Sequence, residues 1–391
     1  MRAALISIDG QPQGAGGETG RMLAGKTLAQ RQLAFALAAG AERIFLLSAG
    51  GSEAEALRKA AETAGCKVQP IAGGRGLLGA VSVADELLVL APGLLPESAV
   101  AVDLLAKGNC VLSLAAGHGI AAGFERIDLE RVWGGALVLP GSLVERLSEL
   151  PPDIEPAAAL LRIALQAKVP ERRLPDDAVD NGTWAMVAAG DAAALQDDAW
   201  LARNLALPPR NRLTAWLALL GLRPLAVRLL GQARAKPALL AAVVVLLAGG
   251  IAATAYGLAP LGFVLAGVGA LAAEFTARFS GLATAPFGKP GRFDWPAFTD
   301  FAVELVITVC AVLAIEQDWL HRLFPSLVLF GLLRALRPAR WQGWAALYGD
   351  PLVVAGVLAI AAAFGGVEVA VMGLALLLIV LEAAKSPTPR G

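Results

Sequence analysis

Residues 237–256 read PALLAAVVVLLAGGIAATAY, twenty positions without a charged side chain. A helix that crosses a bilayer needs about 20 predominantly apolar residues. Some of the apolar stretches that follow are shorter, and adjacent amphipathic residues can complete them. These stretches are 258–275, 301–315, 320–336, 351–364 and 367–381. The pattern predicts an all-α polytopic membrane domain of about six helices over 237–384. The alternative is a set of buried core helices in a soluble protein.

Charge is distributed unevenly along the 391-residue chain. Residues 237–391 hold only 18 of its 66 charged side chains, and the net charge is zero. A hydrophobic content of 57% excludes a disordered chain, and the charge balance argues against a nucleic-acid partner. The three cysteines and two histidines give neither a disulfide framework nor a histidine-rich metal site.

Basic residues predict the orientation of the membrane domain. Cytoplasmic loops carry an excess of Lys and Arg. If six helices cross the membrane and residues 1–195 lie in the cytoplasm, Arg322 is the one basic residue of the membrane domain on the outer side. The basic residues placed inside are Arg278, Lys289, Arg292, Arg334, Arg337, Arg340, Lys385 and Arg390. We therefore expect a multi-pass protein of the bacterial inner (cytoplasmic) membrane, with a cytoplasmic N-terminus and a cytoplasmic tail at 385–391.

Residues 1–195 alternate short apolar runs with helical periodicity. The strands expected from these runs are Ala3–Ile8, Arg43–Ser48, Lys67–Ile71, Glu86–Leu90 and Cys110–Leu114. Helices are expected at 28–39 and 53–64, the second with Ser52 as its N-cap and Glu55 at its third position. Continuous apolar strands between helices predict an α/β domain with a mostly parallel sheet.

A glycine-rich loop follows the first expected strand and includes Gly14, Gly16 and Gly17. Ligands of such sheets bind beyond the carboxyl ends of the strands, where backbone N–H groups can cradle a phosphate. The loop contains neither of the standard phosphate-binding glycine motifs. A flexible loop without a ligand is therefore the alternative interpretation.

Residues 196–236 connect the two parts. Leucines and tryptophans alternate there with Arg203, Arg210, Arg212, Arg223 and Arg228. This pattern indicates an amphipathic connector in the headgroup layer, with its arginines facing membrane lipid phosphates. A helix packed against the front domain is the alternative.

Ionisable residues cluster at the expected inner membrane face, where Glu274 and Arg278 lie one helical turn apart. Asp294, Asp300 and Glu304 begin the third span, and Asp300 and Glu304 share one helix face. These carboxylates are candidate ligands for Mg²⁺, and Asp300 and Glu304 are candidate catalytic residues. In the alternative interpretation Glu274 and Arg278 form an ion pair and Asp300 caps the third helix.

The order of these parts resembles bacterial fusions of a nucleotidyltransferase-like domain with a CDP-alcohol phosphatidyltransferase domain. The most similar family is the bifunctional inositol-phosphate cytidylyltransferase/di-inositol-phosphate-phosphate synthase. In the front domain the resemblance rests on the segments 24–33, 39–47 and 85–90. In the second part it rests on the connector 198–203 and the six expected spans.

The resemblance implies CTP or a CDP-alcohol as ligand, Mg²⁺ as cofactor and a homodimer. It also implies that the glycine-rich loop with Arg21, and Arg278, bind substrate phosphates.

The motifs that carry the chemistry of this family are incomplete. Ala91-Pro92-Gly93 stands where the family places a metal aspartate after its fourth strand. When the membrane motif is aligned on Ala277-Arg278, Ala270 and Ala273 replace its first two aspartates and Glu274 replaces its glycine.

Two functional hypotheses follow. The first is a degenerate membrane-bound relative, a weakly active or non-catalytic partner of an active synthase of phospholipid or polar-lipid headgroups. The second is an active CDP-alcohol phosphotransferase with a rearranged metal site built from Glu274, Asp294, Asp300 and Glu304 with Arg278. A transporter would place its polar groups at mid-membrane, whereas the charges here lie at the inner face.

Overall fold

The computed structural model separates the chain into two compact units. One comprises Met1–Arg203 and Pro286–Gly288, and the other Asn204–Ala285 and Lys289–Gly391. Within them the structure describes residues 1–8, 22–23, 25–48, 50–151, 154–187, 199–205, 207–208, 210, 212–232, 234–284, 286–287, 295–335 and 345–383.

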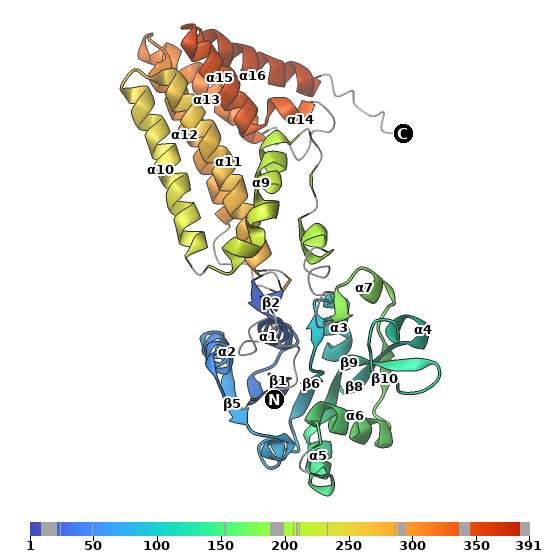
Figure 1. Cartoon of the computed structure of the whole chain (residues 1–391). Coiled ribbons are helices and arrows are strands. Elements are labelled where there is room, and N and C mark those ends of the chain that lie inside the picture. Colours follow the sequence, from blue (N-terminus) through green and yellow to red (C-terminus); the bar gives the residue numbers. More distant parts are fainter. Residues whose placement is uncertain are drawn as a thin grey trace, which may run out of the picture. The chain divides into compact units, whose positions relative to one another are not determined.

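The first unit is an α/β unit around a seven-stranded sheet with the order β10-β8-β9-β6-β1-β4-β5 (Figure 1). Its strands are β1 (Arg2–Ser7), β4 (Arg43–Leu47), β5 (Lys67–Ile71), β6 (Glu86–Leu90), β8 (Cys110–Ala115), β9 (Arg131–Pro140) and β10 (Glu171–Arg173). Four of the neighbouring pairs are parallel, and β9 is antiparallel to both β6 and β8. The predicted mostly parallel sheet is confirmed.

Two short antiparallel strand pairs lie outside this sheet. They are formed by β2 (Met22–Leu23) with β3 (Lys26–Thr27), and by β7 (Leu94–Pro96) with β11 (Trp184–Met186). The helices of the unit are α1 (Leu28–Ala38), α2 (Ser52–Thr63), α3 (Ala99–Ala106), α4 (Ala116–Gly119), α5 (Gly141–Val144), α6 (Pro156–Gln166) and α7 (Asp177–Asp180).

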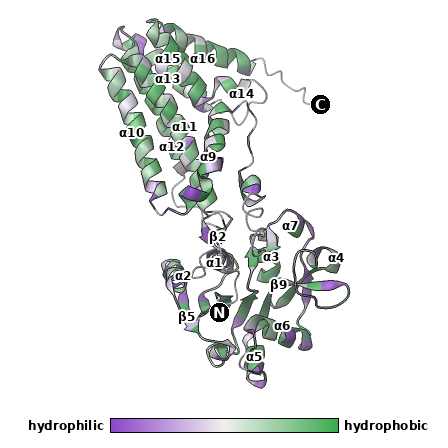
Figure 2. Ribbon diagram, in the orientation of Figure 1, coloured by the Kyte–Doolittle hydropathy of each residue, from purple (hydrophilic) through white to green (hydrophobic). Residues whose placement is uncertain are grey.

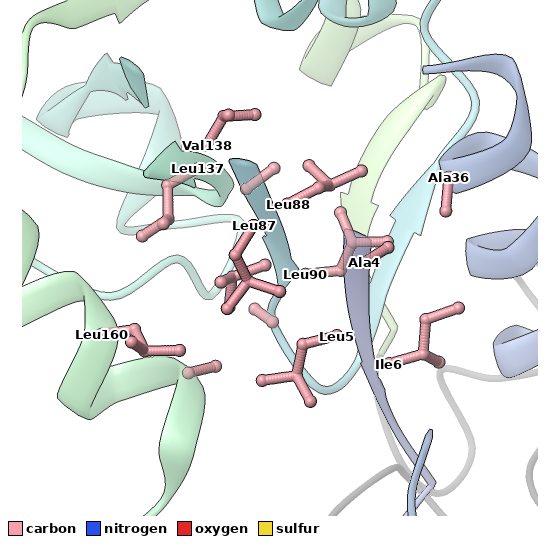
Figure 3. Packing of buried hydrophobic residues seen from close by; sticks show 14 of the residues in the cluster. Ala4, Leu5, Ile6, Ala36, Leu87, Leu88, Leu90, Leu137, Val138 and Leu160 are labelled. Carbon is pink, nitrogen blue, oxygen red and sulfur yellow. The ribbon is translucent and has the colours of Figure 1, made fainter. Parts of the chain in front are cut away.

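The core of the α/β unit lies between the central strands and the helices that cover them (Figure 3). Leu5 of β1, Leu87 of β6 and Leu137 of β9 are at most 1% exposed, and Leu160 of α6 is fully buried. Strands buried on both faces consist of continuous apolar residues. This is why the strand predictions at 3–8, 43–48 and 86–90 agree with the structure to within one residue.

The helix start predicted at Ser52 is wrong in detail. Ser52 is the first helical residue of α2, and Gly51 occupies the N-cap position without a side-chain hydrogen bond. Gly51 has a φ of +107°, a conformation that L side chains rarely adopt. By contrast, α1 begins with a complete capping box between Thr27 and Gln30.

The second unit is helical. Its helices are α9 (Leu213–Leu230), α10 (Ala235–Ala255), α11 (Ala259–Thr284), α12 (Trp295–Ala314), α13 (Trp319–Ala335), α14 (Ala345–Tyr348), α15 (Pro351–Ala363) and α16 (Val367–Ala383). Figure 2 shows hydrophobic residues covering the visible faces of the long helices. Each of the six predicted apolar stretches is helical in the structure.

Four helices of the described residues are long and apolar enough to cross a membrane. They are α9, α10, α11 and the segment Ala297–Ala314 of α12. The chain therefore has the helices of a membrane protein, while a six-span arrangement stays a prediction. α9 falls within the segment that we expected to lie in the headgroup layer, and it packs against α11 and α15.

The tightest helix contact in this unit joins α10 and α11 at two glycines. A Cβ atom on Gly262 would lie 1.9 Å from Oγ1 of Thr254 and 2.8 Å from the carbonyl oxygen of Gly250. Small residues of this kind let two backbones approach closely inside a membrane. α9, α12 and α15 pack against this pair, whereas α13 and α16 pack against α12, α15 and each other.

Candidate functional site

A polar cavity of about 300 Å³ lies at one end of the helical unit. It forms where α9, α12 and α15 begin and where α11 approaches its C-terminal end. Its charged and hydroxyl-bearing lining residues are Arg212, Thr214, Glu274, Arg278, Asp300, Glu304 and Asp350. The four predicted residues Glu274, Arg278, Asp300 and Glu304 are therefore brought together in one place.

Glu274 and Arg278 form an ion pair along α11. Nε of Arg278 donates a 2.7 Å hydrogen bond to Oε1 of Glu274, four residues earlier. The side chain of Arg278 remains 41% exposed, so its other guanidinium nitrogens can still meet a ligand in the cavity. The alternative interpretation, in which Glu274 and Arg278 form an ion pair, is confirmed.

Glu304 is also engaged by an arginine. Nη1 of Arg334, near the end of α13, donates a 3.2 Å hydrogen bond to Oε2 of Glu304. The Arg334 guanidinium also lies 4.9 Å from the ring centroid of Phe301. Two of the predicted metal-binding carboxylates thus each accept a hydrogen bond from a guanidinium.

Asp300 is exposed and lines the cavity one helical turn before Glu304. It lies inside α12, which begins at Trp295. The alternative expectation that Asp300 is the helix cap is therefore wrong. The predicted side chain Asp294 falls outside the described residues.

Asp350 was not predicted, and it joins the beginnings of two helices. Its side chain caps α15 by accepting a 3.1 Å hydrogen bond from the N–H of Leu352. It also accepts a 2.9 Å bond from the N–H of Thr214 and a short one from the Thr214 hydroxyl. Asp350 is only 5% exposed, so this carboxylate is a buried structural element of the cavity wall.

The lining of the cavity holds four carboxylates and two guanidinium groups. α9 and α15 both begin there, and the Asp350 carboxylate accepts hydrogen bonds from N–H groups at both helix starts, so the guanidinium groups are what an anion could meet. They belong to Arg212 and Arg278, and guanidinium groups bind phosphate oxygens well. Among the described residues, no group of three or more His, Cys, Asp or Glu side chains is arranged to hold a metal ion.

The α/β unit is tightly packed at Ala91, in the stretch 91–93 where the resemblance led us to expect a metal-binding aspartate. Ala91 is 5% exposed, and its carbonyl oxygen accepts a 3.0 Å hydrogen bond from the side-chain amide of Gln32. The same amide donates a 2.9 Å bond to the carbonyl oxygen of Leu94. A methyl group packed in this way offers no ligand to Mg²⁺. The predicted residues Gly14, Gly16, Gly17 and Arg21 lie outside the described residues.

A buried charge cluster lies elsewhere in the α/β unit, around Glu97. This carboxylate pairs with Arg31, and it accepts a 2.7 Å hydrogen bond from Arg203 and a 2.9 Å bond from the indole N–H of Trp200. The Arg31 guanidinium also stacks 4.6 Å from the Trp200 ring centroid. Nearby, burial and the positive charge of Arg31 lower the pKa of Lys26. Sequence reasoning missed this cluster because its members come from three distant segments, around Arg31, Glu97 and Trp200.

Comparisons with known proteins give little information about either candidate site. No protein-family description matches the sequence, and no curated protein matches it. Among solved structures, a UDP-glucose pyrophosphorylase from Acinetobacter baumanii aligns at 14% identity and a TM-score of 0.37. The alignment covers 54% of this chain and 95% of that one. Similarity at this level does not establish a shared fold.

Proposed function

We propose that the helical unit binds a phosphate-bearing ligand in the polar cavity, a CDP-alcohol or a phosphorylated headgroup. We further propose that the chain is a weakly active or non-catalytic partner in phospholipid or polar-lipid headgroup synthesis at the bacterial inner membrane. In this proposal the α/β unit is a nucleotidyltransferase-like domain that has lost its metal site.

One observation carries the non-catalytic part of the proposal. Glu274 and Glu304, two of the carboxylates predicted to bind Mg²⁺, are each paired with an arginine. Metal-assisted transfer of a phosphoryl group needs carboxylates available to the cation. The engaged carboxylates and the buried Ala91 both favour a protein that binds such ligands without turning them over efficiently.

The second candidate is an active CDP-alcohol phosphotransferase. It is favoured by the convergence of Glu274, Asp300 and Glu304 on the same cavity as Arg278. A bound phosphate would compete with Glu274 for Arg278, which would release a carboxylate toward Mg²⁺. In that case Asp300 or Glu304 would act as the base on the acceptor hydroxyl.

Ligand-dependent thermal stability of the purified full-length chain in detergent tests both candidates. A CDP-alcohol and CTP are titrated separately, with and without Mg²⁺. A ligand that binds only the native state raises Tm by mass action. We expect a CDP-alcohol to raise Tm by several degrees without Mg²⁺, and Arg278→Ala to abolish the rise. Arg228→Ala, on an exposed part of α9 that does not line the cavity, is the matched control.

The outcomes separate the candidates. A rise that requires Mg²⁺, with turnover that is lost in Asp300→Asn and Glu304→Gln, would support the active transferase. A metal-independent rise without turnover supports the non-catalytic partner, and affinity capture of an active synthase would follow. The absence of a rise with every ligand, from well-folded protein, would contradict both.

A further inference from the structure

A second cavity, of about 330 Å³, opens between α13 and α16. Its lining is Leu320, His321, Phe324 and Pro325 of α13 and Met372 of α16, so apart from His321 it is apolar. Phe324 is 69% exposed and Met372 46% exposed. A space of this size with so few polar partners is unsuited to ordered water. An apolar group fits it better.

The cavity lies at the opposite end of the helical unit from the polar cavity. The polar cavity gathers the beginnings of α9, α12 and α15, whereas Leu320 and His321 belong to the first turn of α13, which follows the end of α12. At this second end, three aromatic side chains are highly exposed: Tyr256 (86%), Trp319 (71%) and Phe364 (86%). Exposed aromatic rings at helix ends are typical of a membrane–water interface.

Helix length agrees with this placement. The 21 residues of α10 rise about 1.5 Å each and so span roughly 30 Å, which is the thickness of a bilayer hydrocarbon core. The α13 residues that line the apolar cavity belong to the first two turns of that helix, which places them near the lipid headgroups and the adjoining part of the acyl-chain layer.

Positively and negatively charged side chains lie near the rim of the cavity. Pro325 has no N–H, so the helical hydrogen bond that would otherwise reach the carbonyl oxygen of His321 is missing. Arg322 follows His321, and its Nε donates a 2.5 Å hydrogen bond to the carbonyl oxygen of Gln317, which leaves its terminal nitrogens for other partners. Glu316 and Asp318 are exposed just before α13. A phosphate can meet Arg322 while an ammonium group meets the carboxylates and the carbonyl oxygen.

We propose that this cavity is a binding site for one zwitterionic, amine-bearing phospholipid of the leaflet opposite the polar cavity. One acyl chain fills the space among Leu320, Phe324 and Met372, and the headgroup lies over the first turn of α13. The site is independent of the proposed function, because it shares no residue with the polar cavity.

Photo-crosslinking in vesicles tests this site with the full chain. The probe is a phosphatidylethanolamine with a diazirine in one acyl chain, present as a minor component of phosphatidylcholine vesicles. We expect adducts at Phe324 and Met372 that saturate and that unlabelled phosphatidylethanolamine displaces. Val245 of α10 is as exposed as Phe324 but lines no described cavity, so its labelling should rise linearly with probe and resist competition.

Two substitutions on α16 provide a matched pair. Met372→Trp should fill the cavity and reduce the saturable labelling at Phe324 at least several-fold. Val369→Trp, at an exposed position outside the cavity, should leave it unchanged. Equal, non-saturable labelling at Phe324 and Val245 would overturn the proposal, as would displacement by phosphatidylglycerol as effective as by phosphatidylethanolamine.

Discussion

The carboxylate of Glu97 accepts a 2.9 Å hydrogen bond from the indole N–H of Trp200, across 103 positions of the chain. Arg31 and Arg203 bind the same carboxylate, and Glu97 is only 7% exposed. Burying a carboxylate is costly unless it is paired and hydrogen-bonded. Glu97 therefore fixes the helical turn at 199–204 onto the α/β unit.

Replacing this carboxylate should destabilise the α/β unit. Glu97→Gln leaves two arginines near an uncharged amide, and we expect a loss of about 3 kcal/mol in the free energy of unfolding. The measurement is urea unfolding of the full chain, with limited trypsin digestion to follow release of the segment after Arg203. Glu86→Gln, which breaks the more exposed pair with Arg2, should cost less than about 1 kcal/mol. Equal costs for the two variants would contradict the buried role of Glu97.

Asp350 should matter for the stability of the polar cavity wall. Asp350→Ala removes the acceptor of the Thr214 N–H and leaves the Leu352 N–H with only its 3.3 Å bond to Oγ1 of Thr214, and we expect a loss of about 1–3 kcal/mol. Asp350→Asn retains one carbonyl oxygen and should lose less. Thermal unfolding in detergent provides the comparison. An alanine variant as stable as the parent would mean that the shared cap contributes nothing.

Two glycines of the same helix should respond differently to a methyl group. Gly262→Ala places a Cβ atom against Thr254 and Gly250, so we expect α10 and α11 to separate slightly at a cost of about 1–3 kcal/mol. A Cβ atom on Gly281 has nothing within 4 Å, so Gly281→Ala should be neutral or slightly stabilising. The measurement is the Tm of each variant and of the parent chain in the same detergent. Similar Tm values would refute the close helix contact.

Cys110 should resist thiol reagents in the folded chain. Burial raises the pKa of its thiol, although Arg172 acts in the opposite direction. Less thiolate is then present at a given pH, and the folded state favours the neutral thiol. Its contribution to stability is present below the unfolded pKa of about 8.5 and is lost as the pH rises through the folded pKa. In a Cys66→Ser/Cys310→Ser background, labelling at pH 8 should require denaturant, and labelling within minutes without it would disprove this.

The buried strands could be predicted because their apolar runs are continuous, but β9 was missed. Its sequence RVWGGALVLP contains Gly134 and Gly135, and a Gly-Gly pair is typical of a turn. In the structure Gly135 has a φ of +78°, and β9 continues through it as the long antiparallel strand between β6 and β8. The glycines serve close packing, since a Cβ atom on Gly134 would lie 3.2 Å from the carbonyl oxygen of Leu112.

The polar cavity could be predicted only where its residues repeat along one helix. Glu274 with Arg278, and Asp300 with Glu304, are four residues apart, and this spacing placed each pair on one face. Arg212 and Thr214 come from a different helix start, and only the tertiary fold brings them near. Asp350 did carry a signal, because an aspartate before a proline and an apolar run is typical of a helix N-terminus.

The order of strands along the chain has a consequence for synthesis on the ribosome. The central strand β6 lies between β1 and β9, so both of its edges are paired only after β9 ends at Pro140. The first helix that is long and apolar enough to cross a membrane, α9, begins 73 positions later, at Leu213. At roughly 5–20 residues per second, the growing chain has about 4–15 s to assemble the sheet centre before α9 is made. The centre of the sheet therefore has time to form before the membrane helices are made, whereas Pro286–Gly288, the last segment of the same unit, follows only after α11.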